Sequence, residues 1–141
     1  MKYKNLIEGV QRRATKLVPE LKNLPYKERL KKLKLTTLVE RRVRGDMIET
    51  YKLITRKESV DPGKFFQMKN VRTGDRVNMI KMKRYNRNNR KYYYTQRVIP
   101  VWNVLSREEG TANKTLDFKK AYDKKEKERQ EARESDIYEW Y

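Results

Sequence analysis

Apolar residues near the start of the chain recur at the spacing of an amphipathic helix. Side chains three or four residues apart lie on one side of a helix, so this pattern predicts a helix from Tyr3 to Val18. Pro19 disfavours helical backbone in the residue before it, and the helix is expected to end there. The predicted inner side consists of Leu6, Val10, Ala14, Leu17 and Val18.

Two further helices are expected before residue 55. A short one begins with Pro25 at its first position and buries Leu30 and Leu33. Thr37 followed by Glu40 fits a capping box, in which each residue satisfies a backbone N–H of the other, and predicts the start of the next helix. The expected inner face of that helix consists of Leu38, Val43, Met47, Tyr51 and Ile54.

The middle of the chain predicts less regular structure. Asp61-Pro62 is typical of a cap followed by one helical turn. Alternation of side chains over residues 77–82 favours a short strand, and YNRNNR has the composition of a turn. Residues 92–105 then form either a returning strand that passes into a helix or a short helix broken before Pro100.

The last helix is expected to be capped by Thr115 and docked by Leu116, Phe118 and Tyr122. The following sequence, KKEKERQEARESD, has no apolar stripe, which predicts a solvated helix or a frayed tail. The fold class is therefore mainly α. We expect a small helical domain of four to five helices with a short β-hairpin in residues 1–122, and a charged helical extension with an aromatic C-terminus in residues 123–141.

The amount and the distribution of charge indicate a function. Of the 141 residues, 40% are charged and 36% hydrophobic, which predicts a thin core and marginal stability. Residues 1–100 hold 28 Lys and Arg against 9 Asp and Glu, whereas residues 101–141 hold 9 against 10. This division of the net charge of +18 indicates a front that binds polyanions and a neutral back.

The sharpest binding signal is the basic window, Arg76–Arg107, which contains nine Lys and Arg and no acid. Cations neutralise phosphates and tyrosine rings stack on unpaired bases, a mixture suited to RNA or single-stranded DNA. The alternative is a solvated hairpin loop whose tyrosines fill the core. The candidate nucleic-acid-binding residues of the window are Arg76, Lys81, Lys83, Arg84, Arg87, Arg90, Lys91, Tyr92, Tyr94 and Arg97.

Two arginine clusters add to this surface, and the C-terminus offers another. Either arginine cluster alone could be a solvated helix face, but together with the basic window they indicate one continuous binding surface. The clusters are Arg12 and Arg13 with Lys16, and Arg41 and Arg42 with Arg44. The aromatic C-terminus predicts a docking site for a protein partner, made of Ile137, Tyr138, Trp140 and Tyr141.

Several classes of function lack their residues. Without cysteine or histidine the chain has no disulfide, no thiolate nucleophile and no ordinary zinc site. It has no glycine-rich phosphate loop and no paired-aspartate polymerase signature, and the acid-x-lysine tripeptides at Asp117 and Asp123 are expected by chance. We therefore expect no enzyme and no cofactor. No apolar run has the length of a signal peptide or a membrane span, which predicts an intracellular chain without a membrane partner.

Three segments carry a resemblance to a known family. They are GVQRRATKLVPELKNLPYKERLKKLKLTTLVERRVRGDMIETYKLI, DPGKFF, and TQRVIPVWNVL followed by TLDFKK. In type and order they resemble the segment just beyond the polymerase thumb in reverse transcriptases of LINE-type (non-LTR, jockey-like) retrotransposons. The charged extension after Lys120 and the DIYEWY end depart from that pattern.

The resemblance implies a region that helps to hold template RNA and target DNA during target-primed reverse transcription. The arginines of both clusters fall on family-like positions, and nuclear or ribonucleoprotein-associated localisation is implied. The chain is too short to contain palm and fingers as well. We therefore expect a non-catalytic module that binds nucleic acid, with RNA favoured over DNA. The alternative is a structural or adaptor subunit of a larger protein or ribonucleoprotein assembly.

Overall fold

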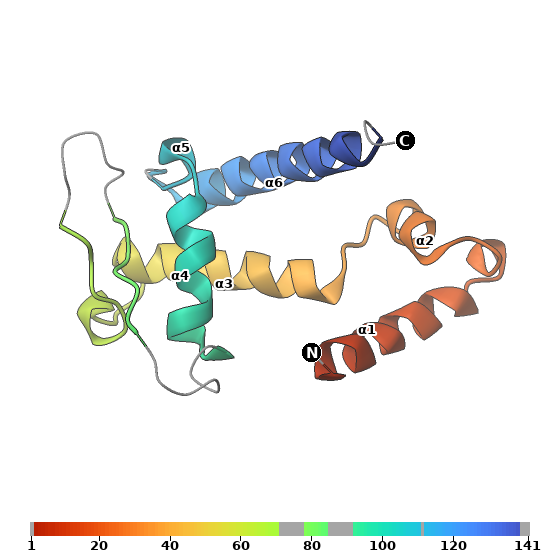
Figure 1. The fold of residues 1–141 in the computed structure, drawn as a ribbon, viewed down its shortest axis with the longest axis horizontal. Coiled ribbons are helices and arrows are strands. Elements are labelled where there is room, and N and C mark those ends of the chain that lie inside the picture. Colours follow the sequence, from red (N-terminus) through yellow and green to blue (C-terminus); the bar gives the residue numbers. More distant parts are fainter. Residues whose placement is uncertain (1, 71–77, 85–91, 111, 139–141) are drawn as a thin grey trace. The chain divides into compact units, whose positions relative to one another are not determined.

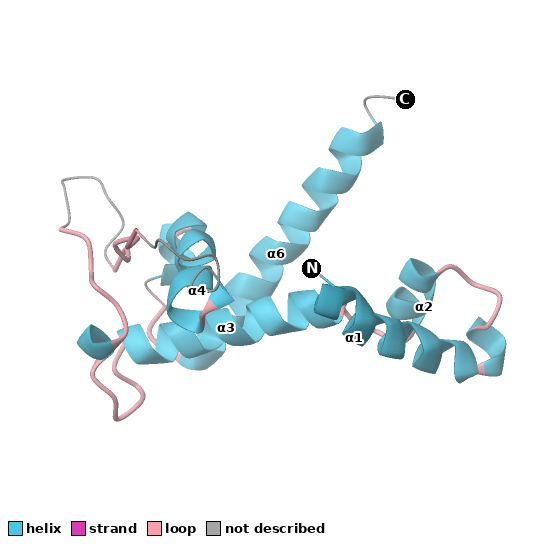
Figure 2. Ribbon diagram, turned by 60° about the horizontal axis from the view of Figure 1, so that its bottom comes forward, coloured by secondary structure: helices cyan, strands magenta, loops and turns pink. Residues whose placement is uncertain are grey.

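The computed structural model describes residues 2–70, 78–84, 92–110 and 112–138, with side chains described for residues 4–132 within these ranges (Figure 1). The chain divides into two compact units, Met1–Gly45 and Asp46–Tyr141, called here the first and second unit. The described residues form helices and loops but no strand (Figure 2), so the expected mainly α class is confirmed.

The first unit contains the helices α1 (Lys2–Ala14) and α2 (Tyr26–Lys32) and the start of α3 (Leu38–Ile54). The 3₁₀ turns η1 (Thr15–Leu17) and η2 (Pro19–Leu21) lie between α1 and α2, with Pro19 opening the second turn. Pro25 is the N-terminal cap of α2 and not its first helical residue, so the helix begins one residue later than expected. The helical order predicted for residues 3–54 is therefore confirmed, with boundaries shifted by a few residues.

A buried arginine joins α1 to α2. Arg29 is 2% exposed, and its guanidinium donates to Thr15 Oγ1 (3.1 Å), the Leu24 carbonyl (2.7 Å) and the Arg12 carbonyl (3.3 Å). A buried cation is tolerated only when its donors are satisfied, and carbonyl and hydroxyl oxygens do so here. The buried apolar side chains of this unit are Leu21 and Leu30, so polar contacts carry much of its packing.

The capping box at the start of α3 is confirmed. The Thr37 N–H donates to Glu40 Oε2 (2.8 Å) and the Glu40 N–H donates to Thr37 Oγ1 (3.2 Å). The next N–H, that of Leu38, donates to Glu8 Oε2 of α1 at 3.0 Å. Because the first N–H groups of a helix have no partner within it, Glu8 both caps α3 and attaches α1 to it.

The second unit is built around an aromatic core. It contains the rest of α3, the turn η3 (Pro62–Lys64), and the helices α4 (Tyr94–Val104), α5 (Arg107–Gly110) and α6 (Thr115–Tyr138). The rings of Tyr51 and Phe118 stack at a centroid distance of 4.4 Å, and Trp102 and Tyr122 each lie 6.1 Å from Phe118. These four side chains from α3, α4 and α6 are buried and hold the three helices together.

The expected hairpin is wrong in its second arm. Residues Tyr94–Val104 form α4, which continues through Pro100 rather than breaking before it. Val98, Trp102 and Leu105 are buried at helical spacing, and burying them compensates the hydrogen bond that Pro100 cannot donate. Tertiary packing thus overrides the strand preference of the tyrosines and β-branched residues.

The expected strand at residues 77–82 is reduced to one bridge, between Met68 and Ile80. The Lys69 N–H donates to the Met79 carbonyl (2.8 Å) and the Lys81 N–H to the Gln67 carbonyl (2.7 Å). We call residues 67–69 and 79–81 the paired segments. On its other edge Ile80 meets α4, where the Asn103 amide accepts from the Ile80 N–H (2.9 Å) and donates to the Ile80 carbonyl (2.8 Å).

The start of α6 lies where it was expected, but its contacts differ in part. Thr115 is the first helical residue rather than the cap, because the Phe118 N–H donates to the carbonyl of Lys114. Phe118 and Tyr122 dock the helix as expected, whereas Leu116 is exposed. The boundary expected between residues 122 and 123 falls inside this continuous helix.

The inner faces expected for two other helices also need correction. Met47 and Tyr51 of α3 are buried, but Val43 and Ile54 are only partly so. On α1 the apolar side is turned outward, since Leu6 is 67% exposed and Val10 55%, and Leu17 of η1 is 82% exposed. The side of α1 that faces the first unit is polar.

We expect Asn103→Asp to lower the free energy of unfolding by about 1–3 kcal/mol, because a carboxylate cannot donate to the Ile80 carbonyl. Urea unfolding followed by circular dichroism measures the change. Asn113→Asp, at an exposed position, makes the same chemical change and should have little effect. Equal effects of both variants would contradict the role given to Asn103.

Burial raises the pKa of Tyr122 from 10.0 to about 12. The unfolded chain therefore loses this proton first, and the stability contributed by neutral Tyr122 is present below pH 10 and lost as the pH rises toward 12. Tyr122→Phe should flatten the fall in unfolding free energy over this range. Tyr93→Phe, at an exposed tyrosine, should leave the profile unchanged.

Candidate nucleic-acid interface

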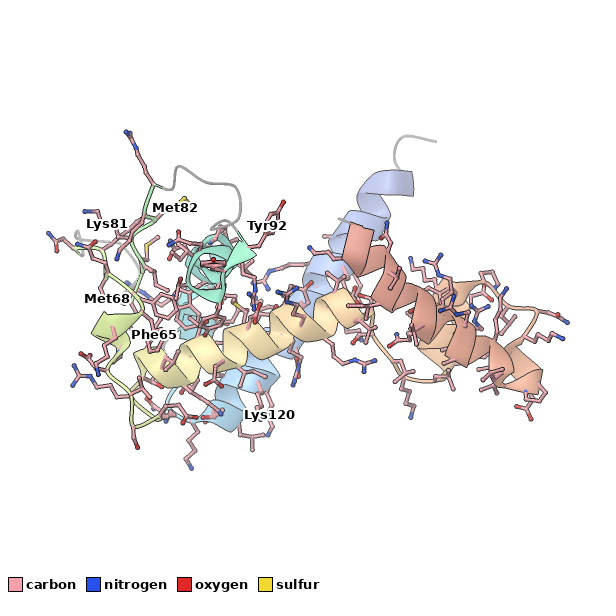
Figure 3. The ribbon with its side chains drawn as sticks, turned by 90° about the horizontal axis from the view of Figure 1, so that it is seen from below. Phe65, Met68, Lys81, Met82, Tyr92 and Lys120 are labelled. Carbon is pink, nitrogen blue, oxygen red and sulfur yellow. The ribbon has the colours of Figure 1, made fainter. Side chains whose placement is uncertain are left out.

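Three described cations of the basic window, Lys81, Lys83 and Arg84, lie at the end of the second paired segment and directly after it. Lys81, Lys83 and Arg84 are exposed, and none of the described carboxylates lies within ion-pair distance of them. Figure 3 shows Lys81 and Met82 toward the upper side of the second unit, with Tyr92 on that side and Lys120 of α6 on the other. Among the described residues, no carboxylate competes with an external anion for these cations.

Lys69 belongs to the same region and was missed from the sequence. It is exposed and lies on the other paired segment, opposite Met79. The signal that would have found it is the pairing of residues 67–69 with 79–81, which is not local in sequence. Phe65, Met68 and Met82 are partly exposed apolar side chains of the same part of the unit (Figure 3).

Arg97 has a different environment from the other cations of the window. Its Nε and Nη2 donate to the two oxygens of Asp46 at 2.8 and 2.9 Å, and Nη1 donates to the Tyr92 carbonyl at 3.1 Å. The hydrogen bond to Asp46 raises the pKa of Arg97. This bidentate ion pair holds α4 against α3. It also neutralises the positive charge of Arg97, which would otherwise be available to a phosphate.

The three consecutive tyrosines divide between core and solvent. The Tyr94 hydroxyl lies 2.9 Å from Thr50 Oγ1 and its ring packs 6.1 Å from Phe66, and burial raises its pKa. Tyr92 and Tyr93 are each 60% exposed. The core alternative therefore holds for Tyr94, while the rings of Tyr92 and Tyr93 are accessible to a base.

The first unit has its own excess of positive charge, with 14 Lys and Arg against 4 Asp and Glu in residues 1–45. Arg13 and Arg42 are exposed, and no described carboxylate pairs with them. Arg12 is exposed and lies over the ring of Tyr26 at 4.9 Å.

Arg41 and Arg44 complete the clusters. Arg41 donates to Gln11 Oε1 (3.0 Å) and to the Thr36 carbonyl (3.3 Å) but remains exposed. Arg44 is partly buried. The clusters of Arg12 with Arg13 and of Arg41 with Arg42 thus lie within one compact unit, which is what a shared anion surface of that unit requires.

Several predicted site residues lie outside the described residues. These are Arg76, Arg87, Arg90, Lys91, Trp140 and Tyr141. Ile137 and Tyr138 lie in the last turn of α6, with side chains that are not described. Docking of a protein through the C-terminus stays a prediction.

Comparison of the chain with family models, with curated proteins and with solved structures found no match. Within the part of the chain that the structure describes, no helix has the length and apolar character to cross a membrane. The same residues contain no cluster of three acidic side chains arranged to hold a metal ion.

Arg97→Gln separates the structural role of Arg97 from the binding role expected from the sequence. Losing the pair with Asp46 should lower the free energy of unfolding by about 1–3 kcal/mol. Because Asp46 already neutralises Arg97, the salt dependence of nucleic-acid binding should stay as in the wild type. A variant with unchanged stability and a shallower salt dependence would instead make Arg97 a phosphate contact.

Proposed function

We propose that the chain is a non-catalytic module that binds nucleic acid mainly through phosphates, with RNA or single-stranded DNA as its ligand. The observation that carries this proposal is the row of exposed cations Lys81, Lys83 and Arg84, which no described carboxylate neutralises. Each cation that replaces a condensed counterion on a polyanion contributes favourable free energy at low salt.

The exposed tyrosines favour a single strand over a rigid duplex. Tyr92 and Tyr93 come at the other end of the segment that begins after Arg84, and both rings are open to solvent. Stacking of a base on such a ring contributes about 1–3 kcal/mol and requires an unpaired base. The positive charge of the first unit adds phosphate contacts without selecting a sequence.

The resemblance of residues 10–54 to the post-thumb segment of LINE-type reverse transcriptases supports the same function. In that reading the module holds RNA or DNA for a polymerase. Nuclear or ribonucleoprotein-associated localisation follows from this proposal.

The test is a salt titration with a charge-matched control. We expect Lys81→Gln/Lys83→Gln/Arg84→Gln to make the slope of log affinity against log salt shallower by about 2, because three phosphate contacts to a single strand are lost. Fluorescence anisotropy with a labelled single-stranded RNA and the matching DNA measures the slope.

The control variant, Lys120→Gln/Lys124→Gln/Lys127→Gln, removes the same charge from α6. Lys127 there already lies 3.8 Å from Glu131, so these side chains are expected to contribute less. Equal losses in both variants would show a general effect of net charge. If the wild type binds neither nucleic acid at low salt, the proposed function is wrong.

A further inference from the structure

The first helix packs with its polar side inward. Glu8 accepts from the Tyr26 hydroxyl and from the Leu38 N–H. Gln11 Nε2 donates to the Tyr26 hydroxyl (3.1 Å) and to the Thr36 carbonyl (3.0 Å). Thr15, just after α1, is buried and accepts from Arg29. Glu8 and Gln11 are three apart on one side of α1, and with Thr15 of η1 they form the side that faces the unit.

The opposite side carries the apolar side chains. We call Leu6 and Val10 of α1, together with Leu17 of the turn η1 that follows it, the apolar stripe; Ile7 borders it and is 55% exposed. Amphipathic helices of compact proteins normally bury such a stripe, since each large apolar side chain removed from water contributes about 1.5–3 kcal/mol. The stripe stays exposed, and among the described residues of the first unit the buried apolar side chains are Leu21 and Leu30.

Within α1 and η1 the exposed charges beside the stripe are positive. Arg13 lies three residues after Val10 on α1, which places it at the edge of the stripe, and Lys16 of η1 is exposed near by. Glu8 is the only acid in residues 2–19, and its carboxylate is held on the inner side. An outer side with apolar and cationic groups but no acid is complementary to an apolar surface bordered by carboxylates.

We propose that the apolar stripe of α1 and η1 docks into an apolar groove with an acidic rim on a second protein. Leu6, Val10 and Leu17 act as the anchors of a helix-in-groove interaction, and Arg13 meets the rim. The role is separate from nucleic-acid binding, because phosphates cannot cover aliphatic side chains. It also differs from docking through the C-terminus.

Two other occupants fit the observations less well. A second copy of the chain would bring together two first units that each hold 14 cations against 4 acids, and the like charges oppose this contact. A lipid surface adapts to any rotation of a helix, whereas the contacts of Glu8, Gln11 and Thr15 fix the rotation of α1. The β-branched Ile7 and Val10 are stiff as well. A fixed ridge of stiff side chains suits a shaped groove.

The experiment uses the full chain in cells with a photo-crosslinking phenylalanine analogue at position 10, and the same analogue at position 116 as control. Leu116 is also an exposed apolar residue, 59% exposed, but lies on α6. We expect irradiation to join position 10, but not position 116, to another polypeptide. That protein is then identified by mass spectrometry, purified and titrated with the chain by calorimetry.

Leu6→Gln/Val10→Gln should weaken binding of the purified partner by at least about tenfold, as expected for anchor residues, while Leu116→Gln leaves it unchanged. Both variants keep the charge, so the salt slope of nucleic-acid binding should not change in either. The salt slope of nucleic-acid binding therefore tests the proposed function alone. Binding of the purified partner tests the docking proposal alone.

Other results would overturn the docking proposal. An adduct of twice the mass of the chain would indicate a second copy, and an internal adduct would indicate the second unit. Adducts with lipid would indicate a membrane surface, if the chain also binds phosphatidylserine vesicles and Leu6→Gln/Val10→Gln weakens that binding. No adduct at position 10, or a purified partner that binds Leu6→Gln/Val10→Gln as tightly as the wild type, would leave the stripe without a protein partner.

Discussion

Scarcity of carboxylates is the constraint on which both the fold and the surface depend. The chain holds 37 Lys and Arg but only 19 Asp and Glu, and several of the acids have structural positions. Glu8 and Glu40 serve the start of α3, and Asp46 holds α4 to α3 through Arg97. Glu109 is fully buried, where it caps α5 by accepting from the Ser106 N–H (2.7 Å) and pairs with Arg129 of α6 at 2.9 Å.

This distribution explains how each of the two basic units can be compact and still present cations that no described carboxylate neutralises. Acids placed at helix starts satisfy N–H groups that have no partner within the helix, and acids placed between helices fix a few selected arginines. Lys69, Lys81, Lys83 and Arg84 receive none of them and stay exposed. The same cations repel one another, so an anionic ligand would relieve a cost that the free protein bears.

Local rules of sequence predicted much of the helical order but not the packing of α4. The capping box at Thr37 and the turn at Asp61 depend on residues next to each other, and both are confirmed. Tyr94, Val98 and Ile99 favour strands by residue type, yet they lie in a helix because the buried positions recur at helical spacing. The binding of Ile80 by Asn103 and of Arg97 by Asp46 joins residues 23 and 51 positions apart. No local pattern contains that information, so sequence reasoning assigned Arg97 to the solvent-facing surface.

The first helix shows a further limit of periodicity. The spacing of Leu6, Val10 and Leu17 predicts an amphipathic helix correctly, but it does not state which side faces inward. The apolar side is usually the buried one, because buried polar groups lose hydrogen bonds to water. Here Glu8, Gln11 and Thr15 all keep hydrogen-bond partners, so burying the polar side does not carry that cost. A unit held together this way gains little from the hydrophobic effect, so its stability is expected to be small when it is alone. Any partner that covers the stripe therefore adds the missing apolar burial and stabilises the unit by mass action, which makes folding and docking of the first unit thermodynamically linked.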